Sequence, residues 1–201
     1  MLSKQYYERF AGYEYMLIYQ LDAYVFSDQL VQWCDQRYDY IGAPWLDAQD
    51  TGENPAFQQP FSVGNGGFSL RRVQTFQSYC DYRIHLIFLA HFLSSIFDII
   101  VKKTKQNPFY VLLRLCTWLP VKTFSKLFFP SEADKNNEDV IWAKRLAVVG
   151  IIPANNIAAQ FSFEDYPEYM FQLHNGLLPF GCHHWNIYYH YQFWKSFIPL
   201  C

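Results

Sequence analysis

A glycine-rich segment constrains the fold of this chain more than any other feature. Residues 63–72 read Val-Gly-Asn-Gly-Gly-Phe-Ser-Leu-Arg-Arg, so three glycines fall within four positions between apolar residues. Glycine in such a setting marks backbone that takes positive φ or that lets another group approach closely. We expect a turn that opens onto a helix over about 71–83, whose free amide N–H groups would receive hydroxyls or phosphate oxygens. A tight turn without a ligand is the alternative explanation.

The length and charge of the chain limit the classes of protein to which it can belong. With 201 residues it fits a single domain, 1–201, that can bury a sizeable core. With a net charge of −2, the chain lacks the excess of positive charge that is typical of nucleic-acid-binding proteins. Aromatic residues make up 20% of the chain, which suits an aromatic core and also suits stacking on carbohydrate.

The cysteines and the first residues bear on the cellular compartment. Five cysteines are scattered without paired metal-ligand spacing, which indicates reduced thiols rather than a disulfide framework. We find no signal peptide ahead of the first motif. We therefore expect a cytoplasmic protein, either free or peripheral on the inner face of the membrane.

Short apolar runs alternate with polar turns, which predicts an α/β fold. The run at 13–20 predicts a buried strand, and 23–26 continues it beyond Asp22. Ligands bind at the carboxyl ends of strands in open α/β sheets, so Asp22 stands at a favourable position. We also expect a short helix at 31–37, an extended segment at 38–45 and a loop at 46–60.

Residues 84–130 differ in character from the rest of the chain. An apolar run at 84–101 is too short and too polar to predict a membrane span. Six basic residues follow, interleaved with aromatic side chains, and no acidic residue lies between Asp98 and Glu132. This pattern predicts a basic, aromatic-rich helical insertion that lies on an anionic membrane. A helical hairpin packed on the main domain explains the pattern equally well.

Acidic residues and histidines stand at two turns of the C-terminal part. We expect Asn137 to cap a helix over 140–146, with Glu138 and Asp139 in its first turn. Acidic residues at that position also simply compensate the helix dipole. We expect extended pieces at 151–153 and 158–162, and a turn at 179–185 that carries His183 and His184.

These polar groups suit a metal-dependent transfer reaction. One carboxylate and one imidazole with open coordination positions make a reasonable Mn²⁺ or Mg²⁺ site, for which Asp22 and His183 are the candidates. Such an ion would neutralise the leaving group of a nucleotide sugar. A separate carboxylate near the acceptor hydroxyl would serve as general base.

The order and the amino-acid sequences of the motifs resemble those of a known family. The strings are Gln-Leu-Asp-Ala-Tyr-Val-Phe at 20–26, Asp-Tyr-Ile-Gly-Ala-Pro-Trp at 39–45, the glycine-rich segment, Glu-Asp-Val at 138–140 and Pro-Phe-Gly-Cys-His at 179–183. Over about residues 10–190, apart from 84–130, they closely resemble a bacterial glycosyltransferase family catalogued as domain of unknown function 5672. More distantly, their order is similar to the metal-dependent GT-A enzymes related to fringe and the β-1,3-galactosyltransferases. The resemblance implies a GT-A-like mixed sheet flanked by helices.

The resemblance implies roles for residues that would bind the donor and the metal ion. Asp22 matches the last aspartate of the Asp-x-Asp motif and would bind the metal together with His183, for which His184 is the alternative. Gln20 stands where the first aspartate would be, and its amide could hydrogen-bond a ribose hydroxyl. The glycine-rich segment would let the backbone approach the donor, which makes four residues candidates for donor binding: Gly64, Asn65, Gly66 and Gly67.

On the acceptor side, the resemblance points to the acidic pair and to two tryptophans. Asp139 matches the catalytic base of inverting members, and Glu138 beside it would contact sugar or acceptor. Trp45 and Trp185 are candidates for stacking on a sugar face, although core packing explains either of them equally well.

The chain departs from the GT-A pattern at its N-terminus. In GT-A folds, strands and helices before the Asp-x-Asp strand bind the nucleotide base, whereas residues 1–10 here have room for one helix. Part of the N-terminal nucleotide-binding half is therefore expected to be missing from this chain.

The expected function is transfer of a hexose from a nucleotide sugar, with a UDP-sugar as the expected donor, to a hydroxyl of a surface glycan or lipid-linked precursor. A truncated, non-catalytic remnant of such an enzyme is one alternative. A membrane-docked binding module, in which 84–130 is the active part, is the other.

Overall fold

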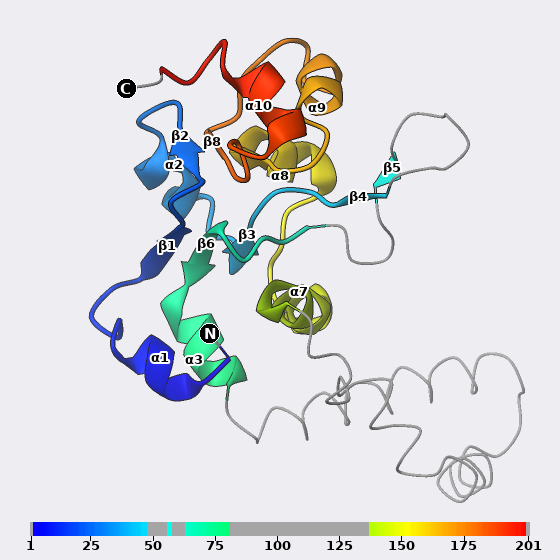
Figure 1. Cartoon of the computed structure of the whole chain (residues 1–201). Helices are drawn as coiled ribbons and strands as arrows, with labels where there is room; N and C mark the ends of the chain where they lie inside the picture. Colours follow the sequence, from blue (N-terminus) through cyan, green and yellow to red (C-terminus); the bar gives the residue numbers. More distant parts are fainter. Residues whose placement is uncertain (1, 48–55, 58–62, 81–136, 200–201) are drawn as a thin grey trace, which may run out of the picture. The chain divides into compact units, whose positions relative to one another are not determined.

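The computed structural model describes residues 2–47, 56–57, 63–80 and 137–199 (Figure 1). Nearly all of them belong to one unit, which is formed by residues 1–77 and 137–201. Of the other unit, residues 78–136, only the first three residues are described. The predicted insertion at 84–130 lies outside the described residues, and so do 81–83 of the predicted helix.

A three-stranded antiparallel sheet carries the glycine-rich segment. Strand β6 (Phe68–Arg72) lies between β1 (Tyr15–Tyr19) and β3 (Tyr40–Ile41), as Figure 1 shows. In this register Leu70 lies opposite Leu17 of β1 and Ile41 of β3. The strand predicted at 13–20 is therefore confirmed as β1, although only Met16 and Ile18 of its residues are buried, and Asp22 follows its carboxyl end.

The prediction that the glycines lead directly into a helix is wrong. Residues 68–72 form the central strand β6, and helix α3 (Val73–Tyr79) begins only after it. The first four residues of β6 are buried, because strands cover both of its edges and side chains pack on both of its faces. A fully buried strand shows no alternation of polar and apolar residues, so periodicity does not identify it.

Two smaller sheets contain the other strands of the described residues. In the first, β8 (Gly181–Cys182) pairs antiparallel with β2 (Tyr24–Val25) and parallel with β7 (Ser162–Phe163). This mixed pairing brings the segment after β8 beside the turn between β1 and β2. The second consists of β4 (Leu46–Asp47) and β5 (Ala56–Phe57), within the stretch that was predicted to be a loop.

The helices surround these sheets. Helices α1 (Lys4–Glu8) and α2 (Leu30–Asp35) agree with the single N-terminal helix and the helix near 31–37 that the sequence predicts. Helix α7 (Glu138–Val149) begins after Asn137 as predicted, although the Asn137 side chain makes no capping hydrogen bond. The remaining helices are α8 (Asn155–Phe161), α9 (Pro167–Leu173) and α10 (Tyr188–Trp194).

The expectation of an extended piece at 158–162 is wrong for all but its last residue. Ala158, Ala159 and Phe161 belong to α8 and are buried. Alanine has the highest helix propensity of the amino acids, and packing of this face against the core stabilises the short helix. The chain becomes extended only at β7.

Aromatic side chains form much of the core. Phe68 of β6, Phe161 and Phe180 all contact one another: the ring centroid of Phe68 lies 5.3 Å from that of Phe161 and 5.8 Å from that of Phe180, and the latter two lie 5.4 Å apart. A second cluster surrounds Trp194, which is fully buried and lies 5.3 Å from the Phe26 ring. A large part of the aromatic content therefore serves packing.

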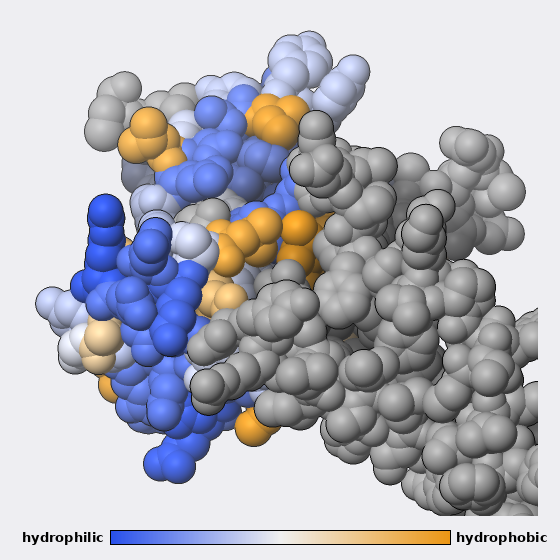
Figure 2. Space-filling view, turned by 90° about the horizontal axis from the view of Figure 1, so that it is seen from below, coloured by the Kyte–Doolittle hydropathy of each residue, from blue (hydrophilic) through white to orange (hydrophobic). Residues whose placement is uncertain are grey.

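Figure 2 shows one face of the molecule, with the described residues coloured by hydropathy. On the face shown in Figure 2, hydrophilic residues predominate and apolar residues form a few groups. Among the described helices, none has the length and apolar character that crossing a membrane requires. Two cysteines in this part of the chain, Cys34 and Cys182, are free thiols, and burial raises the pKa of Cys182.

Candidate functional site

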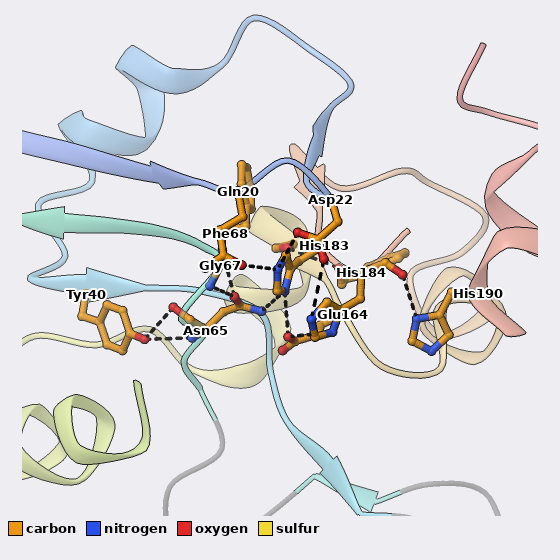
Figure 3. Close-up of polar contacts among 12 residues, drawn as sticks. Gln20, Asp22, Tyr40, Asn65, Gly67, Phe68, Glu164, His183, His184 and His190 are labelled. Atoms are coloured by element: carbon orange, nitrogen blue, oxygen red, sulfur yellow. Dashed lines mark hydrogen bonds and ion pairs between the residues drawn. The ribbon is translucent and has the colours of Figure 1, made fainter. Parts of the chain in front are cut away.

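Three segments that are far apart in the sequence meet at the candidate site. The turn between β1 and β2 supplies Gln20 and Asp22, and the glycine-rich segment supplies the backbone beside them. The segment after β8 supplies His183, whose ring lies between Asp22 and Glu164 in Figure 3. The amide N–H of Gln20 donates to the carbonyl of Gly67 at 2.9 Å, which fixes the first two segments to each other.

Oxygen atoms face both ring nitrogens of His183. Nδ1 lies 2.9 Å from Oε1 of Glu164, while Nε2 lies 3.3 Å from Oδ1 of Asp22 and 3.2 Å from Oε1 of Gln20. The His183 residue is only 3% exposed, so water does not screen these contacts well. Carboxylate oxygens only accept hydrogen bonds, so the contact between Nε2 and Asp22 is satisfied by a proton on Nε2 or by a cation bound between the two atoms.

His184 adds a second imidazole to the site. Its ring stacks on that of His183 with centroids 3.8 Å apart. Nε2 lies 3.8 Å from Oδ2 of Asp22, and Nδ1 lies 3.5 Å from Oε1 of Glu164. His184 has φ 55°, in the left-handed region that non-glycine residues rarely adopt and that clusters at functional sites. This backbone conformation turns both rings toward the same two carboxylates.

The absence of a side chain at Gly67 makes room for His183. A Cβ at position 67 would fall 2.6 Å from Cδ2 of the His183 ring and closer still to Nε2. Real Cβ atoms do not approach other atoms so closely. Gly67 is therefore required by the imidazole that packs against its Cα, whatever else binds at this surface.

Asn65 fixes the turn of the glycine-rich segment from inside. Its Oδ1 accepts hydrogen bonds from the amides of Gly67 at 2.6 Å and Phe68 at 2.8 Å, and the residue is completely buried. The expectation that these amides are free for a ligand is therefore wrong. They stabilise the turn instead, which is the usual role of a buried asparagine side chain beside a turn.

Tyr40 of β3 holds the backbone of Asn65. Its hydroxyl accepts a hydrogen bond from the Asn65 amide at 2.8 Å and donates to the Asn65 carbonyl at 3.0 Å. Complete burial raises the pKa of Tyr40, so the hydroxyl keeps the proton that it donates. Asn65 is thus fixed at both its backbone and its side chain.

A buried ion pair holds the start of α7 against the same segment. Arg71 is fully buried, and its guanidinium pairs with Glu138 and donates to the Tyr7 hydroxyl at 2.9 Å. Burial by itself lowers the pKa of Arg71, but Tyr40, Tyr7 and Glu138 together raise it, so the guanidinium remains charged. Glu138 therefore has a structural partner inside the protein.

The acidic pair at the start of α7 faces Gly66. The position of a Cβ on Gly66 lies 3.5 Å from Oδ2 of Asp139 and 3.5 Å from Oε2 of Glu138. Consecutive Cα atoms are about 3.8 Å apart, so Gly66 and Gly67 bring the acidic pair and His183 to one short strip of backbone. The glycine-rich segment thus joins the two groups of polar residues that the sequence singles out separately.

Trp45 and Trp185, the two candidates for sugar stacking, pack against different parts of the chain. Two ring atoms of Trp45, Cζ2 and Cη2, lie 3.0 Å and 2.9 Å from the position of a Cβ on Gly64, so this glycine makes room for an indole. Trp185 is partly buried and packs against the core cluster around Trp194. Its amide lies 3.4 Å from the carbonyl of Asp22.

The chemistry of the donor set fits a divalent metal ion. Asp22, His183 and His184 each offer one ligand atom, and these atoms lie within 4.8 Å of one another. A carboxylate and imidazoles are ligands for Mn²⁺, Zn²⁺ and related ions. The oxygens of Asp22 and Gln20 that lie near Nε2 of His183 are further possible ligands for such an ion.

Sequence reasoning missed two residues of this arrangement. Glu164 follows the short strand β7, and a carboxylate directly after an apolar run is the same signal that singles out Asp22. Arg71 was expected on a helix, where a charged side chain is usually solvated. Its burial depends on partners that lie 64 and 67 residues away in the chain, and no local pattern reveals them.

A family model described as a protein of unknown function (DUF5672) matches residues 1–183. The matched range includes Gln20, Asp22, the glycine-rich segment and His183, and it ends one residue before His184. No curated protein and no solved structure matches the chain. The chain belongs to the DUF5672 family.

Proposed function

We propose that this protein is a glycosyltransferase with a GT-A-like arrangement. It would transfer a hexose from a nucleotide sugar, with a UDP-sugar as the first candidate, to a hydroxyl of a glycan or lipid-linked precursor. One observation carries this proposal: the neighbouring glycines Gly66 and Gly67 contact two different polar groups. Gly66 faces the carboxylates of Glu138 and Asp139, and Gly67 lies against His183, which contacts Asp22. Such a site has separate groups for a diphosphate leaving group and for an acceptor hydroxyl.

Asp22 and His183 are the candidate ligands of a divalent ion, Mn²⁺ or Mg²⁺. When bound, the ion would neutralise the negative charge of the diphosphate leaving group. Gln20 points its amide at the same place and would orient the donor through a hydroxyl or a phosphate oxygen. The rigid turn built on Asn65 keeps the surface beside the donor in one shape.

Asp139 is the candidate general base. Its carboxylate is half-buried beside Gly66, and it has no buried cation of the kind that holds Glu138 among the described residues. In a direct displacement, the acceptor oxygen forms a bond to the anomeric carbon and its proton passes to Asp139. The bond from the anomeric carbon to the diphosphate oxygen breaks, and its electron pair leaves with the nucleoside diphosphate. The sugar inverts its configuration at that carbon.

Glu138 has a different part in this proposal. Because the buried Arg71 holds its carboxylate, Glu138 positions the first turn of α7 and thereby Asp139. The proposal therefore separates the two acids: Glu138 supports the site, and Asp139 reacts.

Release of nucleoside diphosphate from UDP-hexoses and GDP-hexoses, measured with Mn²⁺ and with water as the acceptor, tests this proposal. We expect release from one nucleotide class by the full chain and loss of at least tenfold in rate for Asp139→Asn. Asp35→Asn, a change of an exposed aspartate in α2, serves as the matched control and should release nucleotide at the unchanged rate. An Asp139→Asn variant as fast as the control would show that Asp139 is not the base. No release from any donor would favour a non-catalytic remnant.

A further inference from the structure

We propose that the metal centre of this protein is a site of two histidines and one carboxylate, made by Asp22, His183 and His184 and supported by Glu164. Such a centre would take a divalent transition-metal ion in preference to Mg²⁺. The role of the ion in catalysis rests on the proposed function. The metal site itself is argued from separate observations and has a separate test.

The two imidazoles present the same edges to the same carboxylates. Each ring has Nε2 on the side of Asp22, at 3.3 Å for His183 and 3.8 Å for His184. Each ring has Nδ1 on the side of Glu164, at 2.9 Å and 3.5 Å respectively. Glu164 and Asp22 therefore lie on opposite sides of a stacked pair of rings, as Figure 3 shows for the residues involved.

Glu164 sets the tautomer of His183. A carboxylate accepts hydrogen bonds only, so the contact of 2.9 Å places the ring proton on Nδ1. The amide nitrogen of Asn65 also lies 3.3 Å from Nδ1, and it cannot be exchanged for the amide oxygen, which already accepts two backbone hydrogen bonds. The shorter, charge-assisted bond to Glu164 prevails over this longer contact. Nε2 is then left with a lone pair that faces Asp22.

This is the arrangement by which carboxylates support metal-bound histidines. A histidine that binds a metal through one ring nitrogen usually donates its other N–H to a carboxylate or carbonyl, which fixes the ring and makes it a better ligand. Here Glu164 supports His183 in this way, and the same oxygen, Oε1, lies 3.5 Å from Nδ1 of His184. The Glu164 side chain is only 12% exposed, so its charge acts strongly on both rings.

The spacing of the donor atoms suits a small cation. Ligand bonds of about 2.1 Å in tetrahedral geometry place neighbouring donor atoms about 3.4 Å apart. Nε2 of His183 lies 3.3 Å from Oδ1 of Asp22, and Nε2 of His184 lies 3.8 Å from the other carboxylate oxygen, Oδ2, so both distances are near this value. His184 is also the more accessible ring, with 37% of its side chain exposed, so one side of the centre remains open to a further ligand.

The donor set determines which ions the centre prefers. Mg²⁺ prefers oxygen ligands in octahedral geometry and retains its water, whereas imidazole suits Zn²⁺ and other transition metals. Two imidazoles and one carboxylate also form the protein ligand set of several catalytic zinc sites. The left-handed backbone at His184, with φ 55°, brings the second imidazole to the site.

Metal affinity measured by competition with a chromophoric chelator tests this inference without any nucleotide. We expect the full chain to bind Zn²⁺ more tightly than Mn²⁺, and to bind Mn²⁺ at least tenfold more tightly than Mg²⁺. The variant His184→Asn should weaken Zn²⁺ binding at least tenfold, and asparagine is chosen because it tolerates the left-handed backbone conformation. Glu164→Gln should weaken Zn²⁺ binding by about 10–100-fold. The controls His174→Gln and Glu168→Gln, which change other residues of the same region, should leave the affinity unchanged.

A second readout separates a supporting role of Glu164 from a merely structural one. The ¹⁵N chemical shifts of the imidazoles report which ring nitrogen carries the proton. They should show protonated Nδ1 in the Zn²⁺-bound wild type, and Zn²⁺ should shift the Nε2 signals of both His183 and His184.

Two results would overturn the inference. One is a wild-type protein that binds Zn²⁺ no more tightly than Mg²⁺, and the other is a folded His184→Asn variant with unchanged Zn²⁺ affinity. In either case the four residues form an ion-pair network or a two-ligand site. If the protein binds Zn²⁺ as predicted but releases no nucleotide from any donor, the proposed function is refuted. The inference about the metal centre is then still supported.

Discussion

Gly67 and His183 are neighbours so close that position 67 has no space for a side chain. The imidazole of His183 lies where a Cβ of residue 67 would be, with Cδ2 2.6 Å from that point. The two residues are linked only through the fold, since β6 follows one and β8 precedes the other. The glycine-rich segment is therefore shaped from within the protein by the histidine of the candidate site.

Replacement of Gly67 by alanine should displace His183 and disturb the candidate site. Overpacking of this kind costs about 1–3 kcal/mol, so the free energy of unfolding should fall by that amount. Metal affinity should fall as well, because Nε2 of His183 moves away from Asp22. Urea denaturation and a metal titration measure the two effects.

Gly66→Ala is the matched control for this change. A Cβ there lies 3.5 Å from the nearest atoms, which is an ordinary van der Waals contact. Its free energy of unfolding and metal affinity should stay close to those of the wild type. Equal effects of the two substitutions would contradict the account of why position 67 is glycine.

Replacement of Arg71 by methionine should destabilise the protein strongly. Loss of the guanidinium leaves the carboxylate of Glu138 partly buried without its partner, which costs about 3–5 kcal/mol. Denaturant unfolding measures the change. Adding Glu138→Gln to Arg71→Met should restore part of the loss, because the unpaired charge is then removed.

The next residue provides the control for this prediction. Arg72 pairs with Glu14 on the surface at 3.2 Å, so Arg72→Met should cost less than about 1 kcal/mol. If Arg71→Met were no more harmful than Arg72→Met, the buried ion pair would not hold the start of α7.

Asn65→Ala should open the turn of the glycine-rich segment. The amides of Gly67 and Phe68 lose their acceptor, and each buried unsatisfied group costs about 1–3 kcal/mol. Hydrogen exchange of these two amides should become faster relative to that of Leu70, which lies within the sheet. Asn65→Asp keeps an acceptor at this position and should protect both amides better than alanine does. Unchanged exchange in Asn65→Ala would show that other groups fix the turn.

The sequence predicts much of the framework of this site. An apolar run followed by Asp22, an acidic pair after Asn137 and a turn with His183 each stand where the structure has a strand end or a helix start. These are local signals, because strand ends and helix starts depend on a few neighbouring residues. They indicate where polar groups emerge, and the fold then brings the groups together.

What the sequence does not reveal depends on contacts over long distances. Residues 68–72 form a strand because β1 and β3 cover both edges, and Arg71 is buried because Tyr7 and Glu138 meet it there. Ala158 and Phe161 belong to a helix because the core packs against them. Glu164 likewise gains its importance only when β7 lies beside β8. For the strand at 68–72, for Arg71 and for Glu164, tertiary packing decides over local preference, whereas at Ala158 it adds to the helix propensity of alanine.

Calorimetric titration of the full chain with UDP, GDP and CMP, with and without Mn²⁺, tests the proposed donor site most directly. We predict metal-dependent binding of one nucleotide and its loss in Asp22→Ala, because Asp22 is the carboxylate that contacts both histidines of the proposed metal site. Asp28→Ala, which changes an exposed aspartate of the following loop, should bind as the wild type does. Binding that is independent of Mn²⁺ and of Asp22, or no binding of any nucleotide, would contradict the proposal.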